Sequence, residues 1–202
     1  DKKVPDTVSD ENVKNGKLVF QAVWKEIAYT ISYDLAGGSL PTGKTNPTTF
    51  TINSKPMDLV QPKREGYTFE GWSGTDINGK DTQVTVTARP LKDRTYTANW
   101  KENSYTIVFN VEGEVTRGEM KNIPLRYTQE TTIPKNGYVC GGYKFVGWRT
   151  GGKKSEQKVY QPGDKVSRLC ATNNGTVNLY PIWEPCEYTI TFDYQTGNKR
   201  EK

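Results

Sequence analysis

The sequence predicts a mainly β protein, α+β at most, in which small modules follow one another with little helix. Three segments begin alike, with an apolar residue at every second position, at 29–35, 105–111 and 188–194. A period of two predicts strands with one buried face. The 19 Gly and 11 Pro residues supply turns, and no long window shows the 3.6-residue period of an amphipathic helix.

Two further landmarks recur in phase with these opening strands. Closing segments with a large–small–Trp pattern end at Trp24, Trp100 and Trp183, and a central Gly-Tyr-x-Phe-x-Gly-Trp motif ends at Trp72 and Trp148. Trp24 and Trp100 are 76 residues apart, as are Trp72 and Trp148, whereas Trp100 and Trp183 are 83 residues apart. The longer interval indicates an insertion after Trp148 in an otherwise regular tandem repeat.

This register divides the chain into four segments. Residues 1–26 are the tail of a preceding repeat, 27–102 and 103–184 are complete repeats, and 185–202 are the first strand of a following repeat. The linkers at 25–28, 101–104 and 184–187 are very short, which predicts a semi-rigid rod. The end strands at 17–24 and 187–194 lack modules of their own. We expect them to pair with neighbouring modules, to exchange between molecules, or to indicate a boundary shifted from the sequence repeat.

Local patterns predict the strands of the first complete repeat at 28–35, 49–53, 67–72, 82–87 and 94–101. Asn78-Gly79 is typical of a hairpin turn between β segments. The best helical candidate in the chain is a single turn at 163–169, with Asp164 as its cap. Asp76, Asn78 and Asp81 offer oxygen ligands for calcium, but their spacing lacks the distant Glu of an EF-hand, and a turn is the favoured interpretation.

The recurring residues resemble the Listeria–Bacteroides repeat, the B-repeat of internalin B and of many bacterial surface proteins. The resemblance rests on Tyr-x-Ile-x-aromatic at the opening, the central Gly-Tyr-x-Phe-x-Gly-Trp and the closing Ala-x-Trp, and it covers essentially the whole chain. Pro181 departs from it, because Ala98 and Ala22 stand at that position in the other repeats. The resemblance implies a β-grasp-like module whose usual helix is short or replaced by a loop.

The resemblance also implies a function and a location. We expect an extracellular, cell-surface repeat stalk or adhesion segment, which spaces or presents other domains and makes weak contacts with a host or matrix protein or glycan. Neighbouring repeats are the expected partners, and nucleic acid is not. No enzyme, cofactor or metal is expected, because the chain has no His and no polar constellation recurs in both complete repeats. No apolar run approaches the length of a membrane span.

The recurring aromatic residues are candidates for a core or for a sugar-stacking platform. Their phase with the strands favours the core, because small modules have little else to bury. The candidate core motif consists of Tyr67, Phe69, Trp72, Trp100, Tyr143, Phe145, Trp148 and Trp183.

Two other candidate sites lie in the second complete repeat. Basic residues cluster in and after its central motif and offer a polyanion-binding face, the alternative function, although such runs are often simply solvated. They are Lys144, Arg149, Lys153, Lys154, Lys158, Lys165 and Arg168. Cys140 and Cys170 are absent from the first repeat, which favours a local disulfide over two free thiols. Cys186 is expected to be unpaired in this segment or to pair outside it.

Overall fold

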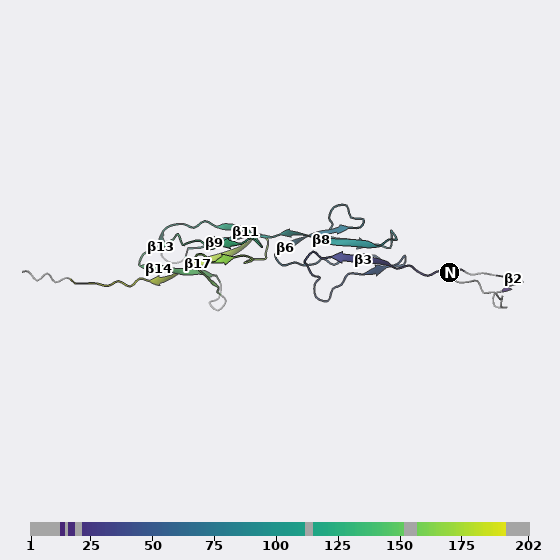
Figure 1. Cartoon of the computed structure of the whole chain (residues 1–202), viewed down its shortest axis with the longest axis horizontal. Coiled ribbons are helices and arrows are strands. Elements are labelled where there is room, and N and C mark those ends of the chain that lie inside the picture. Colours follow the sequence, from purple (N-terminus) through teal and green to yellow (C-terminus); the bar gives the residue numbers. More distant parts are fainter. Residues whose placement is uncertain (1–12, 15, 19–21, 112–114, 152–156, 193–202) are drawn as a thin grey trace, which may run out of the picture.

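The computed structural model describes residues 13–14, 16–18, 22–111, 115–151 and 157–192. Two β modules lie end to end along the long axis of the molecule (Figure 1). They correspond to the two complete repeats and are called the first module (27–102) and the second module (103–184). Among the residues that the structure describes, no helix is long and apolar enough to cross a membrane.

The first module is a four-stranded sheet with a small two-stranded ribbon beside it. The sheet order is β4 (Thr49–Phe50), β3 (Tyr29–Asp34), β8 (Arg94–Glu102) and β6 (Tyr67–Gly74). The opening and closing strands β3 and β8 are parallel neighbours in the middle, and both outer pairings are antiparallel. The ribbon pairs β5 (Met57–Asp58) with β7 (Thr85–Val86).

The second module repeats this topology and extends it by one strand. Its sheet order is β11 (Ile123–Arg126), β9 (Ser104–Phe109), β17 (Gly175–Pro185), β14 (Tyr143–Thr150) and β15 (Val159–Tyr160). Strands β9 and β17 are again parallel. Two ribbons accompany the sheet, namely β10 (Val115–Arg117) with β13 (Val139–Cys140) and β12 (Thr131–Thr132) with β16 (Lys165–Val166).

This arrangement confirms the mainly β, β-grasp-like prediction, with extended ribbons where a helix was expected to be short or replaced. The predicted helical turn at 163–169 is wrong. Asp164 closes a turn instead, because its carboxylate accepts a hydrogen bond from Gln161 N at 2.7 Å. Val166 then pairs with Thr131 as part of β16, and this long-range pairing overrides the local capping signal.

A β-bulge explains the spacing of the central motif. Phe69 and Trp72 are three residues apart, which in a regular strand would place them on opposite faces. The β6–β8 register shifts between Phe69 and Gly71, so both rings face the core, with their centroids 5.6 Å apart. The same shift between Phe145 and Gly147 brings Phe145 within 5.1 Å of Trp148. The repeated motif therefore encodes a bulge that adds an aromatic pair to each core.

Each module has its own core around the buried tryptophan of that motif. Trp72 and Trp148 have no exposed surface. Trp72 faces the small Ala98 across the β6–β8 pair, and Trp148 faces Pro181 at the corresponding place. Burying such a ring contributes on the order of 2–3 kcal/mol in transfer terms, so these two residues are the main hydrophobic anchors.

The two end segments make no strand with either module where they are described. Residues 22–28 and 187–192 carry no strand, and Trp24 is 91% exposed. Tyr188, Ile190 and Phe192, which correspond to the buried Tyr105, Ile107 and Phe109, are likewise exposed. On the N-terminal side of residue 22, β1 (Val13–Lys14) and β2 (Lys17–Leu18) form a small hairpin.

Candidate functional site

The junction between the modules is organised around one buried polar residue, Asn103, which separates β8 from β9. Asn103 is 6% exposed. Its backbone N–H donates to Gly66 O at 2.9 Å, and its carbonyl accepts from Tyr127 N at 2.9 Å. Its side-chain Oδ1 accepts from Thr68 Oγ1 at 2.6 Å, and its Nδ2 donates to Ala171 O at 2.7 Å. Asn103 therefore joins two points of the first module to two points of the second.

The four hydrogen bonds of Asn103 form what we call the Asn103 clasp. Aromatic packing between the modules adds to it. The Tyr67 and Tyr127 rings, one from each module, meet edge-on with centroids 6.3 Å apart. Gly66 makes room for Tyr127, since a Cβ at residue 66 would lie 2.0 Å from the Tyr127 ring. Burial raises the pKa of Tyr127, and the charge of Glu65, which accepts a hydrogen bond from the Tyr127 hydroxyl, raises it further. The tyrosine of the central motif thus serves the junction.

A second polar contact crosses the junction at its edge. Glu102 Oε1 accepts hydrogen bonds from the hydroxyl and the backbone N–H of Thr128, the latter at 2.8 Å. These bonds, the side-chain one first, hold the pKa of Glu102 below its ordinary value. The carboxylate is therefore stabilised in its charged form by the neighbouring module.

The far end of the second module carries part of the same arrangement. Cys186 N donates to Gly142 O at 2.8 Å, as Asn103 N does to Gly66 O. Tyr143, which corresponds to Tyr67, is 47% exposed there because nothing in the described chain packs on it. It is the member of the predicted aromatic core that the structure places at the surface.

The other aromatic residues of the predicted motif lie in or against the two cores. Trp72 and Trp148 are central, and their indole Nε1 atoms have no acceptor among the described residues. Phe69 and Trp100 pack against the first core, and Phe145 and Trp183 pack against the second. This burial leaves Trp72 and Trp148 no exposed face for a sugar platform.

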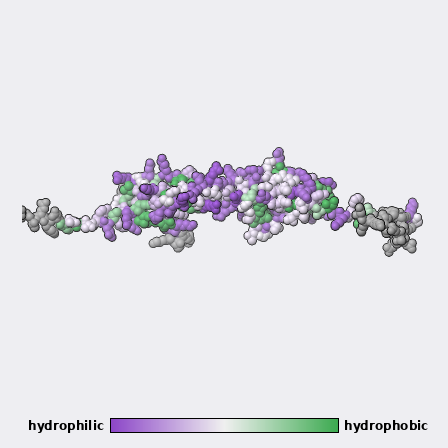
Figure 2. Space-filling model, viewed as in Figure 1, coloured by the Kyte–Doolittle hydropathy of each residue, from purple (hydrophilic) through white to green (hydrophobic). Residues whose placement is uncertain are grey.

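A groove of about 520 Å³ runs along the junction on the side of the first module's central motif. Both modules line it. The first module contributes 62–67, Phe69 and Trp100, and the second contributes Ala171 and Thr172. In Figure 2, hydrophilic residues gather over the middle of the body, where the modules meet.

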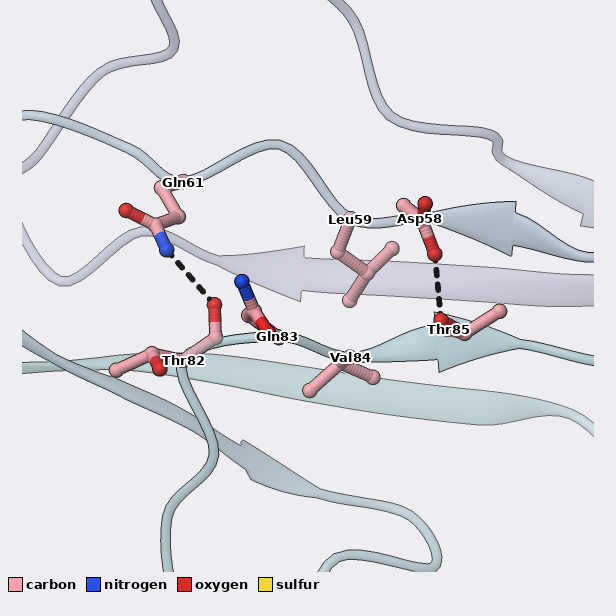
Figure 3. Close-up of a pocket in the computed structure, with 7 residues that line it drawn as sticks. All are labelled: Asp58, Leu59, Gln61, Thr82, Gln83, Val84 and Thr85. Atoms are coloured by element: carbon pink, nitrogen blue, oxygen red, sulfur yellow. Dashed lines mark hydrogen bonds between the residues drawn. The ribbon is translucent and has the colours of Figure 1, made fainter.

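A separate slot of about 430 Å³ lies beside the ribbon of the first module (Figure 3). Its polar groups bond to one another across the slot. Thr85 Oγ1 donates to Asp58 Oδ1, and Gln61 Nε2 donates to Thr82 O at 2.9 Å. With the Asp58 carboxylate and the Gln61 amide nitrogen engaged and no aromatic residue in the lining, the slot offers a ligand little besides the Gln83 side chain.

The structure spreads the predicted basic cluster over several elements. Lys144 pairs with Glu184 at 3.1 Å, and Lys165 pairs with Glu130 at 3.0 Å. Arg149 on β14 stacks over Tyr180 of β17. Strand β14 also pairs with β15, which follows Lys158. Arg168 lies in a loop near the junction, and its own backbone N–H donates to Tyr127 O. Lys153 and Lys154 lie outside the described residues.

The predicted disulfide is corrected by the structure, in which Cys140 and Cys170 are free thiols. The two residues lie at opposite ends of the second module. Cys170 lies beside Gly175, where an added Cβ would touch its Sγ. Cys140 lies three residues before Tyr143, which pairs with Pro185 at the other end of β17. Strand β17 runs from Gly175 to Pro185, and ten residues of strand span about 33 Å. A disulfide needs Cα atoms within about 7 Å.

Turn-like interactions occupy the other oxygen-rich segment. Lys92 Nζ binds Asp76 Oδ1 at 2.9 Å, and Asp81 Oδ1 accepts from Gln83 N. Within the described parts of the chain, no three acidic, Cys or His side chains gather as a metal site would require.

Comparison with known proteins adds the family. The model of the Listeria-Bacteroides repeat domain matches residues 29–99 and 105–180. The chain is 31% identical to internalin H of Listeria monocytogenes over 130 residues, which is 63% of this chain and 22% of internalin H. It is 24% identical over 182 residues to a putative Gly-rich membrane protein of Evansella cellulosilytica, covering 90% of this chain and 19% of that protein. The chain therefore spans about a fifth of these relatives.

Proposed function

Because the chain belongs to the Listeria-Bacteroides repeat family, we propose that it is a stiff spacer within an extracellular bacterial surface protein. Its modules hold another part of the same protein at a defined distance from the cell. The relatives support this setting, since one is an internalin and another is named as a membrane protein. Contacts with host or matrix components are secondary in this proposal, and we expect no catalytic activity.

The observation that carries the proposal is the Asn103 clasp. A flexible linker would leave the two modules free to reorient. Here one residue separates β8 from β9, and its four hydrogen bonds fix both modules. The Tyr67–Tyr127 contact and the Glu102–Thr128 bonds add two further points of attachment. Several separate contacts resist bending about any axis, as a spacer requires.

Residual dipolar couplings of the ¹⁵N-labelled chain test the stiffness directly. If the modules move as one body, the couplings of 29–102 and 104–184 fit a single alignment tensor. Two tensors of different magnitude would show independent reorientation and would overturn the proposal.

The cellular part of the proposal needs a separate test. In the full-length protein, residues 27–184 are replaced by a Gly/Ser linker of equal residue number, and epitope tags are placed on both sides. The proposal expects both tags to be labelled by antibody on intact cells, and the height between them to fall in the linker variant. Unlabelled tags, or an unchanged height, would contradict it.

A further inference from the structure

The junction groove combines two cations with an aromatic wall, and neither cation forms an ion pair within the described residues. Lys63 is exposed, Arg64 is half-buried, and both line the groove. The nearby carboxylates are engaged with the second module, since Glu65 accepts from Tyr127 and Glu102 accepts from Thr128. The charge of Arg64 also helps to lower the pKa of Glu102. The lining therefore holds two cations and one carboxylate, that of Glu65.

Arg64 is held in place as a fixed guanidinium. One face lies on the Tyr67 ring, with Cζ 3.8 Å from the ring centroid. Gly37 lies against the same guanidinium. A Cβ added to Gly37 would lie 3.5 Å from Arg64 Cζ, 3.6 Å from its Nε and 3.8 Å from its Nη2. Since the central carbon is nearest, Gly37 covers a face of the group and not its edge. Nη1 donates to Ala36 O at 3.0 Å.

Among the described residues, the remaining edge of Arg64 has no hydrogen-bond partner. Nε and Nη2 form the pair of parallel donors that matches a carboxylate or sulfate. Because the group is already stacked and tethered, binding an anion there would cost little side-chain entropy. An isolated surface arginine would lose more freedom.

The rest of the groove suits a sugar ring. Tyr67, Phe69 and Trp100 are each partly exposed along one wall, and Ala171 and Thr172 form the other. Trp100 is fixed by the bond from its Nε1 to Leu35 O at 3.0 Å. Aromatic walls present apolar area to the C–H faces of saccharides, and a volume of about 520 Å³ is within the range of small-ligand sites.

We propose that the junction groove binds an acidic saccharide, with the sugar against Tyr67 and Trp100 and its carboxylate or sulfate on Arg64 and Lys63. This goes beyond the spacer function, because it assigns a ligand to the seam between modules. The second module repeats the aromatic residues at its far end but has Val139 and Cys140 where the first has Lys63 and Arg64. The site is therefore specific to this junction and does not follow from the repeat motif.

Titration of the ¹⁵N-labelled chain at about 150 mM salt, where surface charge is screened beyond about 8 Å, tests the proposal. The probes are a hyaluronan tetrasaccharide with carboxylates only, a heparin tetrasaccharide with sulfates, neutral cellotetraose and a tetraglutamate peptide. One or both acidic saccharides should shift the amides of 63–67, Ala171 and Thr172 and the indole N–H of Trp100. Which of the two binds more tightly separates a uronate from a sulfate as the anion.

Variants separate the fork from simple charge. Arg64→Gln should weaken binding at least tenfold, which corresponds to about 1.4 kcal/mol. Arg64→Lys keeps the charge but loses the planar fork, and should still weaken binding severalfold. Lys63 pairs with Ser39 through its backbone alone, so Lys63→Gln leaves the fold intact and should weaken binding by a smaller factor. The matched control is Lys55→Gln, an exposed lysine at the opposite end of the first module, with no effect expected.

Four outcomes of the titrations would overturn the proposal. They are equal binding of cellotetraose, equal binding of tetraglutamate, shifts confined to the surface around Arg149 and Lys158, and no shift with either acidic saccharide. Full binding by Arg64→Gln would also overturn it, since the assigned fork would then contribute nothing.

Discussion

Replacing Asn103 with Ala removes the side-chain part of the clasp and leaves its two backbone hydrogen bonds in place. Two side-chain hydrogen bonds are lost, those with Thr68 Oγ1 and Ala171 O. Each is worth about 0.5–1.5 kcal/mol net. Thr68 is exposed and can bond to water, whereas Ala171 O is half-buried. We therefore expect the variant to lose about 1–3 kcal/mol, and to lose it from the coupling between the modules.

The assay must report on each module separately. Fluorotryptophan labelling provides this, because Trp72 and Trp100 report on the first module and Trp148 and Trp183 on the second. In urea, Asn103→Ala should lower the unfolding midpoint for both pairs of signals, because each module loses support from the other. Asn99→Ala is the matched control, since Asn99 Nδ2 donates only within the first module, to Gly71 O and Ser73 Oγ. It should lower the midpoint of the first pair more than that of the second.

Two results would refute this reasoning. One is a second-module transition that Asn103→Ala leaves unchanged, which would mean that the clasp carries no coupling. The other is additivity of Asn103→Ala with Thr68→Ala. Residues that share a hydrogen bond should show an interaction energy of about 0.5 kcal/mol or more in a double-mutant cycle.

Three further predictions concern the junction and the thiols. Gly66→Ala should destabilise the chain by more than Gly79→Ala in urea titrations, because both glycines have positive φ but only at residue 66 would the Cβ strike Tyr127, at 2.0 Å; equal losses would show that the Tyr127 contact is unimportant. The pKa of Glu102 is lowered on folding, so its contribution is present above the ordinary value of 4.5 and is lost as pH falls through the folded value; the pH at which the Thr128 amide shift changes should lie below 4.5, and Glu102→Gln should abolish that step. Buried Cys140 should react with maleimide more slowly than the half-buried Cys170 and Cys186, and a non-reducing digest that links Cys140 to Cys170 would contradict their placement.

The sequence was sufficient for the main sheet because its strands are long and periodic. The expected segments 28–35, 67–72 and 94–101 correspond to β3, β6 and β8, and each boundary agrees to within two residues. The two-residue ribbon strands β5 and β12 carry no such period. Val86 and Val166 fix them through pairing across the module, and local patterns cannot show a partner so distant in sequence.

The site was harder to predict because its polar residues do not recur. The search for repeats found what both modules share, which is the core and the bulge. Asn103 instead reads as an ordinary polar linker residue, and its partners Thr68 and Ala171 are 35 and 68 residues away. Lys63 and Arg64 likewise belong to one repeat only. The basic cluster was visible as a run in sequence, but the fold separates its members and gives Lys144 and Lys165 acidic partners.

The contrast between conserved core and variable junction within this one chain has a mechanical consequence. The backbone bond to the glycine before the motif tyrosine is the same for Asn103 and Cys186, so the path of the chain leaving each module is set by the repeat itself. The side chain at this position is not set by the repeat. The Asn103 amide bridges two modules because it donates and accepts strongly, whereas the Cys186 thiol does both weakly. Lys144 also stands where Thr68 supplies the donor to Asn103. A module docked beyond Cys186 would follow the same path with a weaker clasp, so stiffness in such an array is set joint by joint, by the residues that differ between repeats.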